Sequence, residues 1–298
     1  GVFSALDAPV RTSFSSELVG REDIPSAISL NSANFNAGRL LGPAASGFMI
    51  VAFGTGVSFL VNSITYLLLV IALLMLRSDE LHIQVQPDSG AKLKAAVAYV
   101  LRTREIFLVM MAVFFATTFG LNFQIFAALM ATQEFGKGPA EFGILGSVLA
   151  IGSFTGVIIS AKLEHLRVPR IVMLGTFAFG ALLMIGAWMP SYETFALFLP
   201  LVGGIALFTL ISANSFVQTT CEPTLRGRVM GIYLLIFMGG TPIGSPLIGF
   251  SAEQLGIRPT IMICGTIVAA AGIWLAIALR KHLRDAKDVP ASTTSLNE

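Results

Sequence analysis

Eight long apolar runs follow one another along this chain of 298 residues, and they restrict its fold more than any other feature. Each run reaches the ~20 residues with which a helix crosses about 30 Å of hydrocarbon. One such run fits a buried helix of a soluble protein, but eight do not, and only 12% of the residues are charged, against about 25% in ordinary soluble domains. The sequence therefore predicts an all-α integral membrane protein whose helices satisfy their own backbone hydrogen bonds. The runs cover residues 24–52, 57–76, 106–131, 142–161, 171–189, 194–218, 229–250 and 260–279.

Basic side chains gather in alternate segments between these runs. Of the 19 Lys and Arg residues, sixteen lie in one set of segments, Lys137 and Arg258 lie in the other, and Arg39 lies inside a run. The positive-inside rule places the richer set, and with it the C-terminus, in the cytoplasm of a multi-pass plasma (inner) membrane protein. The richer set consists of Arg11, Arg21, Arg77, Lys92, Lys94, Arg102, Arg104, Lys162, Arg167, Arg170, Arg226, Arg228, Arg280, Lys281, Arg284 and Lys287.

An internal repeat relates the two ends of the chain. A shift of 202 residues superposes four glycines on four others, and a basic segment precedes the matched run each time. A chance match between glycine-rich helices is the alternative. If the repeat is real, residues 194–279 correspond to residues 1–76. The opening "GVFSALDAP" reads as the end of a membrane helix, so we expect further helices upstream. The matched pairs are Gly38 with Gly240, Gly42 with Gly244, Gly47 with Gly249 and Gly54 with Gly256.

Several motifs resemble the major facilitator superfamily. "DAPVR" (7–11) and "GRLLGPAASG" (38–47) are similar to its fourth and fifth helices, and "LRGRVMGIYLLIFMGGTPIGSPLIG" (225–249) is similar to its tenth-to-eleventh loop and eleventh helix. The whole chain is most similar to the branch that contains the enterobactin (siderophore) exporter and macrolide efflux proteins. The resemblance implies a major facilitator fold with eight full transmembrane helices plus the end of a ninth, equivalent to helices 4–12 of twelve.

This resemblance also implies a division of the chain. Residues 1–76 are expected to be the remainder of an N-terminal six-helix half, and residues 106–281 the C-terminal six-helix half, followed by a cytoplasmic tail at 282–298. Residues 77–105 are expected to form the cytoplasmic linker. Its second part predicts a short amphipathic helix at the membrane surface. The apolar residues expected on one face of that helix are Leu93, Val97, Val100 and Leu101.

The function that the resemblance implies is secondary active transport. We expect a monomer, surrounded by membrane lipid, that exports a small molecule by alternating access in exchange for protons. The substrate expected is a drug-like compound or a siderophore. The "GP" of the fifth helix resembles the antiporter motif of drug exporters, although Ser46 replaces one glycine of its closing pair. A facilitator-type nutrient importer is one alternative, and a non-transporting membrane scaffold or inactive fragment is another.

Arg39 is the only charged residue inside the eight runs. It lies 15 residues after Ile24, so a rise of about 1.5 Å per residue puts it roughly 20 Å deep. An arginine at the bilayer centre costs at least about 2.5–3.5 kcal/mol, so we expect it to face the protein interior. Two interpretations remain open. Arg39 either pairs with an acid of an upstream helix or lines the substrate pathway, where a cation suits an anionic or oxygen-rich ligand such as a siderophore.

Amide side chains are further candidates for this pathway. Asn36 lies close to Arg39, Asn122 and Gln124 lie in the run 106–131, and Asn214 lies in the run 194–218. Buried amides also commonly bridge neighbouring helices. The sequence leaves open which of the two roles each amide has.

Small residues spaced four apart mark two helix faces that can approach another helix closely. Gly38, Gly42 and Ser46 share one face, and Gly152 and Gly156 share another. Ordinary helix packing accounts for such faces. The resemblance implies more, because helices five and eight of the superfamily meet at the seam between its two halves, which opens and closes during transport.

Four charged residues are candidates for a network at the cytoplasmic gate. Asp7 and Arg11 lie four apart at a helix end, where they suit a simple ion pair. The resemblance implies that they belong to a charge network that latches the gate, with Arg226 and Arg228 as partners. The two arginines also fit a role in topology alone.

Enzyme chemistry finds no support in the sequence. The eight runs contain no His, Asp or Glu, so we expect no catalytic residues and no metal ligands there. The phosphate-binding pattern GxxxxGK[ST] does not occur, and Cys221 and Cys264 lack metal or disulfide spacing. A net charge of +2 predicts no nucleic-acid partner, and we expect no cofactor. We expect the acid that couples transport to protons in the upstream helices.

Overall fold

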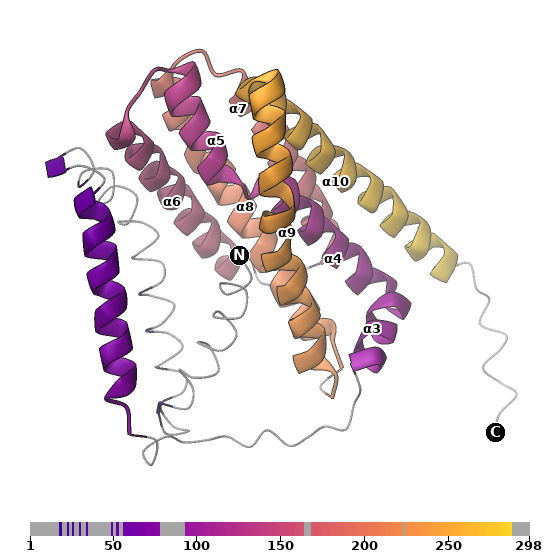
Figure 1. Cartoon of the computed structure of the whole chain (residues 1–298). Helices are drawn as coiled ribbons and strands as arrows, with labels where there is room; N and C mark the ends of the chain where they lie inside the picture. Colours follow the sequence, from indigo (N-terminus) through magenta and orange to yellow (C-terminus); the bar gives the residue numbers. More distant parts are fainter. Residues whose placement is uncertain are drawn as a thin grey trace, which may run out of the picture. The chain divides into compact units, whose positions relative to one another are not determined.

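The computed structural model describes residues 56–77, 93–163, 168–222 and 224–287, together with isolated positions between 18 and 53. Every regular element in these ranges is helical (Figure 1). Seven of the described helices are long and apolar enough to cross a membrane. This finding confirms the all-α membrane class. The predicted run 24–52 and the helix end before it lie outside the described residues, so the count of eight helices and part of a ninth stays a prediction.

The described helices follow the predicted runs closely. Each begins and ends within a few residues of its run, except where a helix continues past the apolar stretch into charged residues. The last helix continues longest, because its final turns carry Lys, Arg and Asp that can be solvated outside hydrocarbon. The first span is the helix Gly56–Leu74. The others are α6 (Pro139–Lys162), α7 (Pro169–Ala187), α8 (Tyr192–Thr220), α9 (Arg226–Leu255) and α10 (Ile257–Lys287).

The span Arg104–Glu134 differs from the others because it consists of four consecutive helical pieces. Its apolar composition predicted one continuous helix over 106–131. The structure instead contains two π-helical segments and a short interruption after the first of them. The pieces are α4 (Arg104–Phe115), η2 (Ala116–Gly120), α5 (Phe123–Leu129) and η3 (Met130–Glu134).

A short helix, α3 (Leu93–Arg102), precedes this span, as the amphipathic pattern predicted. The predicted apolar face is partly wrong. Ala96 and Val100 are buried, whereas Val97 and Leu101 are 42% and 61% exposed. Ala96 and Val100 lie one turn apart, and the small Ala96 lets α3 lie against α4 and α9. The apolar residues of α3 therefore form two faces. Ala96 and Val100 pack against the neighbouring helices, whereas Val97 and Leu101 are exposed.

The chain divides into two compact units. One unit contains Gly1–Ser89, Phe123–Thr155 and Met189–Gly203, and the other contains Gly90–Asn122, Gly156–Trp188 and Gly204–Glu298. The core of the second unit is built from apolar side chains of α3, α4, α7, α8, α9 and α10. Its most deeply buried members include Ile106, Leu108, Val109, Met110, Val172, Met173, Val217, Val229, Leu275 and Leu279. The sequence-based division into halves, linker and tail stays a prediction.

Within the second unit, α7 and α10 pack closely along their length. A Cβ atom at Gly180 would overlap the backbone of Gly265 and Ala269, and one at Gly272 would overlap the backbone of Phe177. Glycine at these positions lets two helix backbones touch, which is the main source of packing energy between helices in lipid. The two helices therefore form a closely packed pair within the unit.

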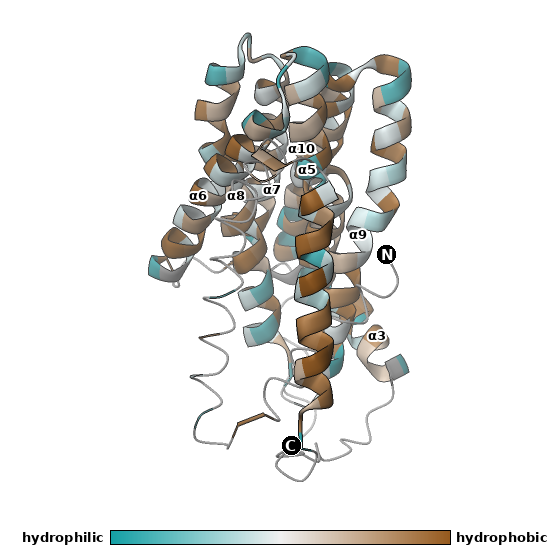
Figure 2. Cartoon of the chain, turned by 60° about the vertical axis from the view of Figure 1, so that its left-hand side comes forward, coloured by the Kyte–Doolittle hydropathy of each residue, from teal (hydrophilic) through white to brown (hydrophobic). Residues whose placement is uncertain are grey.

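The exposed surface of the helices is strongly apolar. The most apolar window of the helix Gly56–Leu74 is 0% buried, and the corresponding window of α9 is 22% buried. Figure 2 shows the brown colour of hydrophobic residues along most helices, with paler stretches on α9. Large continuous apolar surfaces of this kind need lipid or further protein around them.

Candidate functional site

The candidate site is the interruption in the span Arg104–Glu134. The backbone N–H of Leu121 donates to the carbonyl of Ala116 at 3.0 Å, which closes the π-turn of η2, and α5 begins only at Phe123. A Cβ atom at Gly120 would overlap the Phe179 ring of α7, so a larger residue there would require this ring to move. Irregular helical segments of this kind occur frequently at functional sites.

Asn122 lies in the interruption, directly before α5. Its side chain is 3% exposed, and its amide nitrogen donates to the carbonyl of Thr118 at 2.7 Å. The hydroxyl of Ser245 on α9 donates to the amide oxygen of Asn122 at 2.7 Å, and it also lies 2.8 Å from the carbonyl of Thr241. Both polar ends of the buried amide are thus satisfied, as the low dielectric around it requires. Asn122 links η2 to α9.

Two glycines of α9 allow this contact. A Cβ atom at Gly240 would overlap the side chain of Thr117, and one at Gly244 would overlap the carbonyl of Thr118 and the amide of Asn122. The backbones of η2 and α9 therefore touch, with only small side chains between them. Small residues of this kind let two helix backbones approach closely in lipid.

The hydroxyl of Thr118 adds an unusual feature. Thr118 is 1% exposed, and its hydroxyl has no hydrogen-bond partner among the described residues. A buried hydroxyl without a partner costs free energy. The site consequently holds a polar group that another arrangement of the two helices could satisfy.

The structure does not join the predicted pathway residues to one another. Gln124 is exposed in the first turn of α5. Asn214 is half-buried in α8, where it accepts a hydrogen bond from Gln218 at 2.8 Å and interacts with the Tyr233 phenol. Arg39 and Asn36 lie outside the described residues. The pathway formed by these residues stays a prediction.

The glycines of α6 have a defined contact. A Cβ atom at Gly152 would overlap the backbone of Pro200, and one at Gly156 would overlap the backbone of Gly204, so both glycines pack against α8. Gly38, Gly42 and Ser46, the predicted other side of the seam, lie outside the described residues. The seam stays a prediction, and any contact of α6 with a further helix must be compatible with its contact to α8.

The predicted gate network is described only in part. Arg226 is exposed and Arg228 is half-buried in the first turn of α9. Asp7 and Arg11 lie outside the described residues. Within the described ranges, no group of three His, Cys, Asp or Glu side chains lies close enough to hold a metal ion.

Sequence reasoning did not single out the polar residues around Asn122. Thr117 and Thr118 precede it in the cluster "TTFGLN" (117–122), which is a small, polar interruption of an otherwise apolar run. That interruption was the available signal for a broken helix. Gly240 and Gly244 were noticed only because they repeat Gly38 and Gly42.

A family match agrees with this architecture. The family described as transmembrane secretion effector (MFS_3) matches residues 1–297. The chain belongs to this family. It is therefore a membrane transport protein of the major facilitator superfamily, as the motifs of its helices indicated, and a multi-pass inner-membrane protein. Members of this family are generally not enzymes.

Relatives of this chain include proteins that are named as transporters of siderophores. The chain is 24% identical over 269 residues to the staphyloferrin A transporter of Staphylococcus aureus, covering 89% of this chain and 66% of that protein. It is 21% identical over 294 residues to the enterobactin exporter EntS of Salmonella typhimurium, covering 98% of this chain and 70% of that exporter. It is 22% identical over 297 residues to the enterobactin exporter EntS of Shigella boydii serotype 18, covering 99% of this chain and 70% of that exporter. The chain thus spans about two thirds of the length of these relatives.

Proposed function

We propose that this protein exports a small molecule, a siderophore or a drug-like compound, by alternating access in exchange for protons. The observation that carries the proposal is the broken, polar helix held against α9 by Asn122 in a chain of the secretion effector family. Substrate sites of secondary transporters commonly lie at discontinuous helices near the middle of the bilayer. The names of the relatives, which include an enterobactin exporter and a staphyloferrin A transporter, support a siderophore.

In this proposal Arg39 supplies the positive charge of the pathway. Siderophores carry many oxygen atoms, and a guanidinium donates hydrogen bonds to paired oxygens better than any other side chain. Asn36, Gln124 and Asn214 contribute polar positions along the same route. Asp7, Arg11, Arg226 and Arg228 form the cytoplasmic gate network, which breaks when the pathway opens inward.

Transport of a named probe tests the function. We expect proteoliposomes that contain the gene product to accumulate enterobactin or staphyloferrin A when their lumen is acidic. In an exchange of substrate for protons, the protons that leave the acidic lumen drive the substrate into it. A protonophore should abolish the accumulation, and empty liposomes serve as the control. Accumulation driven only by an acidic exterior would indicate an importer. Absence of counterflow with both siderophores would favour a scaffold.

The orientation in the membrane is tested separately. In a background without Cys221 and Cys264, we expect Gln133→Cys to react with an impermeant maleimide in intact cells, whereas Ser89→Cys should react only after lysis. The excess of basic residues in the alternate segments motivates this expectation. Gln133 is exposed at the end of η3, so its substitution leaves the core intact. Labelling of Ser89→Cys alone in intact cells would reverse the topology.

The two native cysteines suit removal for this test. Both are free and buried. Burial raises the pKa of the Cys221 thiol above its ordinary value, while the nearby Arg226 opposes this shift in part. A raised thiol pKa leaves less of the reactive thiolate at neutral pH, so labelling of Cys221 in the protein that retains it should be slow and should increase with pH.

A further inference from the structure

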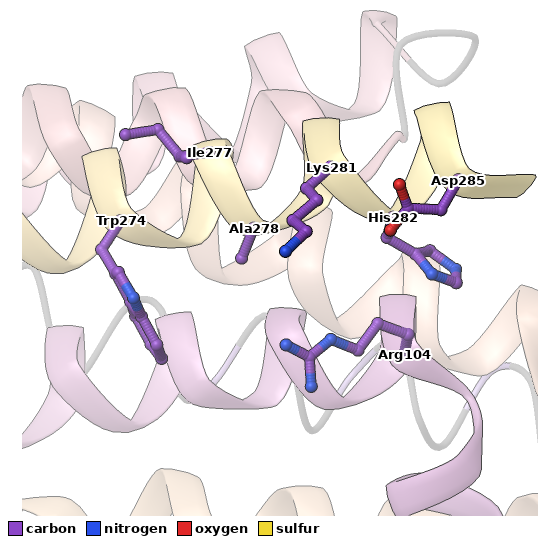
Figure 3. Close-up of a pocket in the computed structure, with 7 residues that line it drawn as sticks. All are labelled: Arg104, Trp274, Ile277, Ala278, Lys281, His282 and Asp285. Atoms are coloured by element: carbon purple, nitrogen blue, oxygen red, sulfur yellow. The ribbon is translucent and has the colours of Figure 1, made fainter.

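An open pocket of about 390 Å³ lies between the beginning of α4 and the last turns of α10, away from the broken helix. Figure 3 shows Arg104 reaching into it from α4. Trp274 and Ile277 line one end, and Lys281, His282 and Asp285 line the other. In Figure 3 the Trp274 ring points toward α4, whereas the Ile277 side chain points away from it. The pocket thus changes from apolar to charged along about three turns of one helix.

Two cations point into the same gap. In Figure 3 the ammonium group of Lys281 points from α10 toward α4, and the guanidinium of Arg104 lies across the gap from it. Two like charges in one pocket repel each other unless an anion lies between them. Asp285 lies one turn further along α10, and among the described residues no ion pair joins it to either cation. Arg104 makes a cation–π contact with the Phe107 ring at 5.9 Å, and its guanidinium has no hydrogen-bond acceptor among the described residues.

The other end of the pocket suits an alkyl chain. Trp274 and Ile277 are 54% and 61% exposed, although both are large and apolar. At about 1.5 Å per residue the 31 residues of α10 extend for roughly 46 Å, which exceeds the ~30 Å of hydrocarbon. The charged last turns therefore emerge from the hydrocarbon, and Trp274 lies seven residues, or roughly 10 Å, before Lys281, on the hydrocarbon side of these turns.

We propose that this pocket binds an anionic phospholipid, with its phosphodiester between Arg104 and Lys281 and an acyl chain along Trp274 and Ile277. Basic pockets between transmembrane helices recognise anionic headgroups in this way. Such a lipid would hold α4, the first piece of the broken span, against α10. The inference is independent of the molecule that the protein transports, since no residue of the pocket belongs to the proposed pathway.

Native mass spectrometry of the purified gene product tests this proposal. We expect one phosphatidylglycerol molecule to remain bound to the protein under conditions in which phosphatidylcholine dissociates from it. Arg104→Gln and Lys281→Gln should each weaken phosphatidylglycerol binding roughly fivefold, as expected for one basic residue near an anionic headgroup. Arg280→Gln is the matched control, because Arg280 is exposed on the same helix but does not line the pocket, and it should change binding less than twofold. Lys281→Arg should retain binding.

Four results would overturn the proposal. They are unchanged binding in both glutamine variants, an equal loss in Arg280→Gln, equal retention of phosphatidylcholine, and displacement of phosphatidylglycerol by soluble glycerol phosphate at the same concentration. The last result would identify a site for a free anion instead of a lipid. Gel filtration of each variant, with Lys281→Arg as the folded reference, separates a loss of binding from a loss of structure.

Discussion

Gly244→Ala is expected to lower the free energy of unfolding by about 1–3 kcal/mol, the usual cost of overpacking a well-packed contact. The added methyl group would overlap the carbonyl of Thr118 and the amide of Asn122, so α9 must move away from η2. This displacement also lengthens the hydrogen bond from Ser245 to Asn122, which leaves a buried amide oxygen without its donor. We also expect transport by Gly244→Ala to fall, because η2 and α9 lose their close contact.

Gly239→Ala is the matched control. Gly239 precedes Gly240 on the same helix, and no described atom lies within 4 Å of a Cβ atom built there. Both substitutions replace glycine by alanine inside α9, so they gain the same helix propensity, and the difference between them reports the packing alone. Thermal unfolding of both variants in the same detergent measures that difference. Equal stabilities would show that α9 does not pack on η2 through Gly244.

Arg39→Gln is expected to reduce siderophore efflux more than tenfold without preventing membrane insertion. Loss of one charge-assisted hydrogen bond costs about 1.5–3 kcal/mol, which corresponds to roughly 10- to 150-fold in binding. Arg39→Lys keeps the charge but lacks the planar pair of donors, so it should reduce efflux less than Arg39→Gln. The assay is efflux from proteoliposomes, normalised to the folded fraction by gel filtration.

Arg21→Gln is the control for this experiment. Arg21 precedes the run 24–52 and belongs to the segments predicted to be cytoplasmic, so its substitution removes the same charge outside the membrane. We expect its efflux to remain within twofold of that of the unchanged protein. Normal efflux by Arg39→Gln would exclude the pathway role. Loss of folded protein in both Arg39 variants, with Arg21→Gln still folded, would instead favour a buried structural pair.

The apolar length of each run determined the positions of the membrane helices. Helices α6, α7 and α8 begin and end within about three residues of the predicted runs, since a helix in lipid must be apolar for as long as it crosses hydrocarbon. The motifs of the fifth and eleventh helices likewise identified the superfamily, because they depend on local residue patterns. The helix positions and the superfamily motifs both depend on local sequence, so they can be predicted from a single sequence.

Tertiary structure alone decided which surfaces meet. Sequence spacing marked Gly152 and Gly156 as a close-packing face, but it did not determine that Pro200 and Gly204 of α8 lie against them. The same holds for Asn122, whose partner Ser245 is 123 residues away. Apolar content in the run 106–131 likewise predicted a single helix, and the interruption at Asn122 depends on what α9 and α7 place beside it. Hydropathy is set residue by residue, whereas a packing partner is selected by the shapes of helices that are distant in sequence.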